Sequence, residues 1–192
     1  MQGLHEKAGR QTDGKRRKPV TGPHAGAAPK KPKGRTAVCL SYAQNLCFQK
    51  YSEELLKSAD VRSMDGFLQH AGVTCLEHSF SVARTSLWLG EKLRLQVDRR
   101  SLIRGALLHD FFLYDWHLKS NRKGLHGFTH PKTALKNAEE RFFLTDIERD
   151  IIIKHMWPLT PAPPKYTESF LVGCADKLCS LREILRMGPL VK

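Results

Sequence analysis

The residues with the clearest chemical potential in this sequence are the adjacent pair His109 and Asp110, which lie in an apolar stretch. On a helix, side chains three and four positions apart are neighbours. For Asp110 these neighbours are Ala106, Leu107, Leu113 and Tyr114. A buried carboxylate costs several kcal/mol unless a proton, a cationic side chain or a metal ion neutralises it. The pair is therefore a candidate metal-binding element.

Three more residues of ligand type, His78, His155 and Asp176, lie where the helical pattern predicts burial. A single buried histidine is more often a hydrogen-bonded core residue than a metal ligand. Five such residues on four different helices are better explained together, because bundles build metal sites from side chains on facing helices. Imidazole and carboxylate groups suit Fe, Mn, Co, Zn or Ni.

The elements that would position these residues are all helices. From residue 37 onward apolar residues recur every three or four positions, and alternation of the strand type is nearly absent. The expected helices are 74–93, 99–116, 131–143, 145–156 and 167–185, with a loop at 119–128 and two short helices within 38–68. Capping boxes begin at Thr74 and Thr145, and Pro131 suits a first helical turn. The sequence predicts an all-α, single-domain helical bundle over residues 37–192, with about six to seven helices.

The candidate ligands follow the order His, His-Asp, His, His, Asp along the chain. This order resembles the six-ligand pattern of the HD-domain metal-dependent phosphohydrolase superfamily. In this sequence the pattern falls on His78, His109, Asp110, His130, His155 and Asp176. His130 is followed by Pro131, which resembles the His-Pro pair that opens a later helix in many HD proteins. The resemblance covers about residues 74–185, the expected core of the metal site.

The resemblance implies a centre of two divalent transition-metal ions, drawn from Fe, Mn, Co, Ni or Zn. The first ion would take His78, His109, Asp110 and Asp176 as ligands. The second would take His130 and His155, with Asp110 as the bridge and the candidate catalytic residue. Two ions about 3.5–4 Å apart can activate a bridging water and clamp the attacking and leaving oxygens of a phosphoryl group.

The sequence departs from the family pattern after the doublet. Many HD proteins continue with Ile-Gly-Lys, whose lysine can meet phosphate, but here residues 111–113 are Phe-Phe-Leu. A phosphate-binding cation must come from elsewhere, and the candidates, with ordinary surface charge as the alternative, are Arg122, Lys123 and Lys132. Three further residues near the same loop are candidates for groups that support the ligands or for a general acid: Asp115, His117 and His126.

The positive charge of the chain is concentrated near its N-terminus. The net charge is +13, and residues 1–36 contain ten Lys and Arg but only two acidic residues. This segment is also rich in Gly and Pro, which predicts a disordered basic tail. It is either an arm for nucleic acid or anionic membrane, or a solvated extension. Its lack of aromatic residues disfavours nucleic acid as a partner.

Cysteine usage and hydropathy indicate where the protein works. The five cysteines include no Cys-x-x-Cys pair, which fits a reducing compartment. No apolar run approaches the length of a membrane span, and no signal-peptide pattern follows the first residues. We expect a soluble, cytoplasmic protein that does not bind membranes.

The leading functional hypothesis is a phosphohydrolase that cleaves a phosphomonoester or phosphodiester of a nucleotide or other small metabolite. Its partner would be a small phosphorylated substrate. The same ligand set also fits a di-iron oxygenase of the HD type. A third hypothesis is a non-catalytic module that binds metal or, through the basic tail, nucleic acid. The tail hypothesis predicts salt-dependent binding that disappears when residues 1–36 are deleted.

Overall fold

The computed structural model describes residues 37–118 and 125–192, so the predicted disordered tail lies outside the described residues. Within those ranges the chain forms seven α-helices, a short 3-10 helix and one two-stranded antiparallel sheet. Their bounds are α1 (Tyr42–Leu56), α2 (Ala59–Ser63), η1 (Met64–Gly66), β1 (Leu68–His70), β2 (Val73–Thr74), α3 (Cys75–Lys92), α4 (Arg99–Leu108), α5 (His126–Glu139), α6 (Asp146–Lys154) and α7 (Thr167–Ile184). The predicted all-α fold is confirmed. None of the helices in the described ranges has the length and apolarity that crossing a membrane would need.

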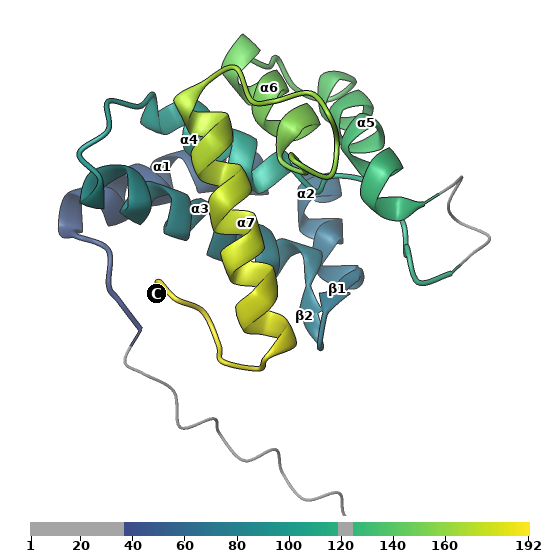
Figure 1. Cartoon of the computed structure of the whole chain (residues 1–192), viewed down its shortest axis with the longest axis horizontal. Helices are drawn as coiled ribbons and strands as arrows, with labels where there is room; N and C mark the ends of the chain where they lie inside the picture. Colours follow the sequence, from purple (N-terminus) through teal and green to yellow (C-terminus); the bar gives the residue numbers. More distant parts are fainter. Residues whose placement is uncertain (1–36, 119–124) are drawn as a thin grey trace, which may run out of the picture. The chain divides into compact units, whose positions relative to one another are not determined.

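Four helices form the centre of the bundle. The helix α3 packs against both α4 and α7, and α6 packs against both α4 and α7. Figure 1 shows α7 with α3 behind it, and α5 beside α6. The buried core includes the large side chains Phe48, Phe111, Phe112, Ile151 and Ile152.

The predicted capping boxes fix the starts of two central helices. The Thr74 side chain accepts a hydrogen bond from the Glu77 backbone N–H at the start of α3. The Thr145 side chain does the same with Glu148 at the start of α6. These bonds satisfy backbone donors that would otherwise be unpaired in the first turn. Both predicted starts are confirmed.

The predicted end of the helix over 99–116 is wrong. The helix α4 ends at Leu108, and the chain then turns so that Leu113 has a φ of 57°. The Asn137 amide on α5 donates to the carbonyls of Phe111 and Phe112, at 2.9 and 3.1 Å. These carbonyls are therefore paired by a neighbouring helix and do not need a continued α4.

The predicted start of the helix over 131–143 is also wrong. The helix α5 begins at His126, inside the expected loop, and ends at Glu139. Pro131 thus lies inside the helix, where it removes a backbone donor. The missing backbone hydrogen bond would have gone to the Gly127 carbonyl in the first turn, so its absence costs the helix little stability. Residues 119–124 of the expected loop lie outside the described residues.

The hairpin of β1 and β2 was not predicted. Its strands span three and two residues, which is too short to show an alternating pattern. Ala71 and Gly72 both have positive φ, at 49° and 91°, and reverse the chain between the strands. The hairpin places the buried Gln69 against the doublet of the candidate metal centre.

Candidate metal centre

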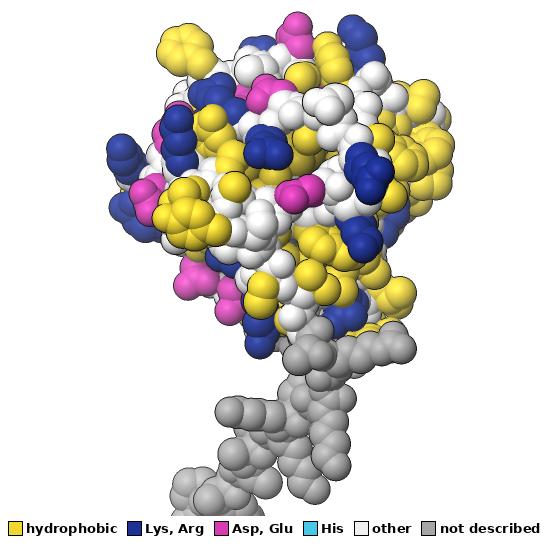
Figure 2. Space-filling model, turned by 90° about the vertical axis from the view of Figure 1, so that its left-hand side faces the viewer, with side chains coloured by type: hydrophobic (Ala, Val, Ile, Leu, Met, Phe, Trp, Pro, Cys, Tyr) yellow, Lys and Arg dark blue, Asp and Glu magenta, His cyan; other side chains and the backbone are white. Residues whose placement is uncertain are grey.

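The structure brings the six predicted ligands into one buried cluster. They come from four helices and the turn after α4, and each side chain is enclosed: His78, His109, Asp110, His130, His155 and Asp176. Their donor atoms form overlapping groups within 4.8 Å of one another. On the face of the molecule in Figure 2, charged and hydrophobic side chains are interspersed and no histidine is visible.

Asp110 lies at the middle of the cluster and divides it into two halves. Its Oδ2 atom lies 3.4 Å from His109 Nε2 and 4.0 Å from His78 Nε2. Its Oδ1 atom lies 3.2 Å from His130 Nε2 and 3.6 Å from His155 Nε2. We call His78, His109 and Asp176 the first half, and His130 and His155 the second half. Asp110 faces both with separate oxygens.

Asp176 completes the first half from α7. Its Oδ1 atom lies 3.1 Å from His78 Nε2 and 3.8 Å from His109 Nε2. His155 is also within reach of His109 and Asp176, so the two halves are contiguous.

All four histidines are anchored through Nδ1. His109, His130 and His155 donate to the backbone carbonyls of Ala106, His126 and Ile152, at 2.7, 2.8 and 2.9 Å. His78 donates to the Glu183 carboxylate at 3.0 Å. A proton on Nδ1 leaves the Nε2 lone pair free to bind a metal ion. Each imidazole is therefore held with Nε2 facing the cluster.

Several donor atoms of the cluster face one another without a hydrogen-bond donor between them. The Nε2 atoms of His130 and His155 lie 2.8 Å apart, and both nitrogens are acceptors once Nδ1 carries the proton. His109 Nε2 and Asp110 Oδ1 are buried without a hydrogen-bond donor. Such contacts are unfavourable between lone pairs but suit ligands that share a metal ion. The residues present fit a divalent metal site.

The electrostatics keep both carboxylates and His155 in the forms that bind a metal ion. Burial favours neutral carboxyl groups, but the adjacent His109 and the other histidines hold the pKa of Asp110 well below its usual range. Bonds to His109 and His78 likewise override burial and lower the pKa of Asp176. Burial and the neighbouring imidazoles lower the pKa of His155 to about 3. Both carboxylates are thus ionised and His155 is neutral.

His78 and His109 are the exceptions in this cluster. Burial acts to lower the pKa of His109, but the carboxylates of Asp110 and Asp176 raise it above its usual range. Burial also acts to lower the pKa of His78, but hydrogen bonds to Asp176 and Glu183 raise it to about 10. A metal ion that binds at His78 must therefore displace a proton, which is a general feature of metal sites built from histidine.

Two residues of the site were missed by the sequence reasoning. The Gln69 amide donates to Asp110 Oδ2 at 2.6 Å, and the Cys75 thiol donates to the Gln69 amide oxygen. Glu183 binds His78 from the last turn of α7. Both are polar residues at positions without a motif, and only the buried position of Glu183 on an amphipathic helix could have drawn notice.

The supporting residues predicted from sequence have different positions. The His126 ring stacks on His130, with ring centroids 4.5 Å apart, and on Trp116 at 4.9 Å. Asp115 and His117 form a hydrogen bond with each other at 3.1 Å near the surface. Lys132 is exposed on α5, whereas Arg122 and Lys123 lie outside the described residues. The structure thus places His126 directly against a predicted ligand.

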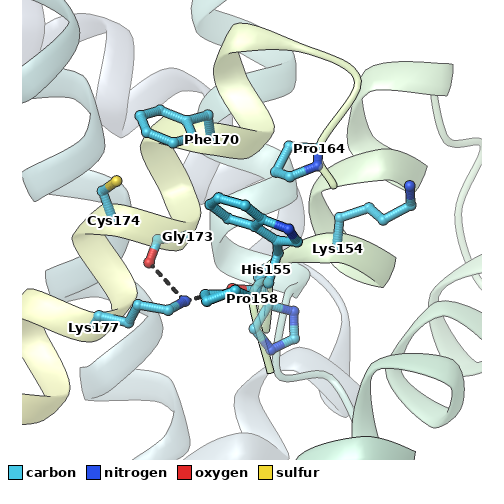
Figure 3. A pocket seen from close by; sticks show the side chains of 9 residues that line it. Lys154, His155, Pro158, Pro164, Phe170, Gly173, Cys174 and Lys177 are labelled. Carbon is cyan, nitrogen blue, oxygen red and sulfur yellow. Dashed lines mark hydrogen bonds between the residues drawn. The ribbon is translucent and has the colours of Figure 1, made fainter. Parts of the chain in front are cut away.

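An open pocket borders the backbone of His155. Figure 3 shows Lys177 reaching across it, and its amine donates to the carbonyls of His155 and Gly173 at 2.9 and 3.1 Å. Trp157 and Phe170 supply much of the apolar wall. Neither Asp110 nor Asp176 lines this pocket, so we do not propose it as the substrate-binding site.

Comparison with known families agrees with this geometry. The sequence model of the HD domain family matches residues 75–180, which is more than half of the chain. The chain therefore belongs to the HD domain family, which indicates a metal-dependent hydrolase. Comparisons with curated proteins and with solved structures give no match.

Proposed function

We propose that the chain is a phosphohydrolase that cleaves a phosphomonoester or phosphodiester of a nucleotide or other small metabolite at a dinuclear metal centre. The main support for this proposal is the position of Asp110, whose two carboxylate oxygens face two separate pairs of histidine Nε2 atoms. A carboxylate in that position suits a bridge between two ions. Asp110 is therefore the proposed catalytic residue.

Two bound divalent ions would polarise a phosphoryl group and activate a water molecule at neutral pH. The chain contributes orientation and charge. Backbone carbonyls and Glu183 fix the four imidazole rings, and Gln69 holds one oxygen of Asp110 while leaving the other open. These groups keep the donors in place before a substrate arrives.

The phosphate of a substrate would need a cationic side chain near the metal centre. Lys132 follows His130 by two positions on α5 and carries an exposed amine. We propose it, with Arg122 and Lys123, as the source of the cation that the sequence lacks after the doublet. His126, stacked on His130, is the proposed proton donor to a leaving oxygen. Asp115 and His117 are proposed to support this region.

We also propose a cytoplasmic location. The five cysteines, all in the described part of the chain, are unpaired, as expected in a reducing compartment.

The test is metal analysis of the protein purified with and without oxygen, followed by phosphatase and phosphodiesterase screens with Mn, Fe, Co and Ni. We expect about two ions per chain and phosphate release that depends on them. Fewer than about two ions, with no change in His130→Ala or His155→Ala, would refute the dinuclear centre. Oxygen uptake without phosphate release would favour the di-iron oxygenase.

A further inference from the structure

We infer that Glu183 is a positioning residue that makes the first half of the centre the tighter metal site, so that the second half fills later. This inference rests on the proposed dinuclear centre. It concerns a residue that no sequence motif marks and that touches the metal ligand His78, not the substrate.

The contacts of Glu183 are directed at one ligand. Both of its carboxylate oxygens lie 3.0 Å from His78 Nδ1, and the residue is 8% exposed. Within the described residues its side chain makes no other hydrogen bond or ion pair. A buried carboxylate with a single partner is costly unless that partner is positively polarised. His78 is so polarised when its Nε2 atom binds a cation.

The other three histidines lack this support. Their Nδ1 atoms donate to the neutral carbonyls of Ala106, His126 and Ile152. A carboxylate is the stronger acceptor, and it raises the basicity of the imidazole that binds the metal. His78 should therefore be the strongest imidazole ligand of the four.

The distribution of charge points in the same direction. The first half has Asp176 and one oxygen of Asp110 as anionic donors, with Glu183 behind them. Among the described residues, the nearest anionic donor to the second half is the other oxygen of Asp110. A divalent cation is thus attracted more strongly to the first half.

The test is a titration of the full chain, stripped of metal, with Mn²⁺ or Co²⁺. It compares the wild-type protein with Glu183→Gln, which keeps a hydrogen-bond acceptor but removes the charge. Glu168→Gln is the matched control, because Glu168 lies on the same helix, is 7% exposed and binds the backbone N–H of Asp98. We expect Glu183→Gln to weaken the tighter binding constant about 10- to 100-fold and to leave the weaker one nearly unchanged.

The outcomes separate this inference from the proposed function. Unchanged constants in Glu183→Gln, or an equal loss in Glu168→Gln, would overturn the role of Glu183. A weaker constant that falls as much as the tighter one would overturn the assignment to the first half. Uptake of a single ion by the wild-type chain would refute the dinuclear centre, and the effect of Glu183→Gln on that one constant would still report on Glu183. Circular dichroism of the metal-free variants checks that each is folded.

Discussion

The two halves of the candidate centre differ in the groups that support their donors. In the first half, His78 and Asp176 lie on α3 and α7, which are 18 residues each and pack directly against one another, and the Glu183 carboxylate binds His78. In the second half, His155 is the C-cap of α6 and His130 lies near the start of α5, and both rings donate to neutral backbone carbonyls. The two halves should therefore respond differently to mutation.

The largest effect is expected from Asp110→Asn, because this residue faces both halves. Loss of its charge should reduce turnover by more than about 100-fold, since even residues that only support a ligand contribute 10- to 100-fold. Steady-state kinetics with the best substrate of the screen measures this effect. Asp150→Asn is the control, because Asp150 on α6 accepts from the backbone N–H of Lys165 and is not a predicted ligand. Turnover that survives Asp110→Asn would contradict the proposed mechanism.

The second-largest effect is expected from His130→Ala and His78→Ala, which test metal binding at each half separately. His130→Ala should remove about one metal ion per chain and leave the tighter binding constant in place. His78→Ala should instead remove the tighter constant. Metal content after dialysis and a competition titration with a chelator measure both. Equal losses in the two variants would show that the halves bind metal as one unit, against the comparison drawn above.

A large loss of stability is expected from Arg104→Ala. The Arg104 guanidinium on α4 binds Glu148 on α6 at 2.7 Å, and these side chains are 3% and 0% exposed. Removing one partner leaves a buried charge, which should lower the free energy of unfolding by about 3–5 kcal/mol. Denaturant titration measures it, with the half-exposed Arg149→Ala as the control, expected to change by about 1 kcal/mol or less.

The same variant tests the comparison of the two halves. Because His155 is the C-cap of α6, a loosened contact between α4 and α6 should weaken metal binding at the second half. If a folded but destabilised Arg104→Ala protein kept the weaker metal-binding constant, the second half would not depend on the contact between α4 and α6.

The smallest effect is expected from Gly105→Ala at the same contact. An added Cβ would lie 2.5 Å from Cδ1 of Ile151, so the helices must shift at a cost of about 1–3 kcal/mol. Gly66→Ala is the control, because nothing lies within 4 Å of its added Cβ. Ile151→Val removes Cδ1, so the double variant should lose less stability than the sum of the two single variants. A purely additive result would show that the clash is not the cause.

Local patterns in the sequence were enough to predict much of the fold and the membership of the cluster. The capping boxes at Thr74 and Thr145 predicted the starts of α3 and α6, because those hydrogen bonds join residues only three positions apart. Five ionisable residues at buried helical positions, together with His130 from the family resemblance, predicted which side chains the structure brings together. Periodicity and ligand chemistry are properties of short stretches, and the sequence displays them directly.

Contacts between distant segments were decided only by the tertiary structure. The helix α4 ends at Leu108, and Asn137 pairs the carbonyls of Phe111 and Phe112, although residues 109–116 have a helical pattern. Gln69 and Glu183 reach Asp110 and His78 across 41 and 105 residues of sequence. No local pattern records such pairings, because they depend on how the helices pack. The sequence by itself determined which ionisable residues are candidate donors, and packing decided how each of them is oriented.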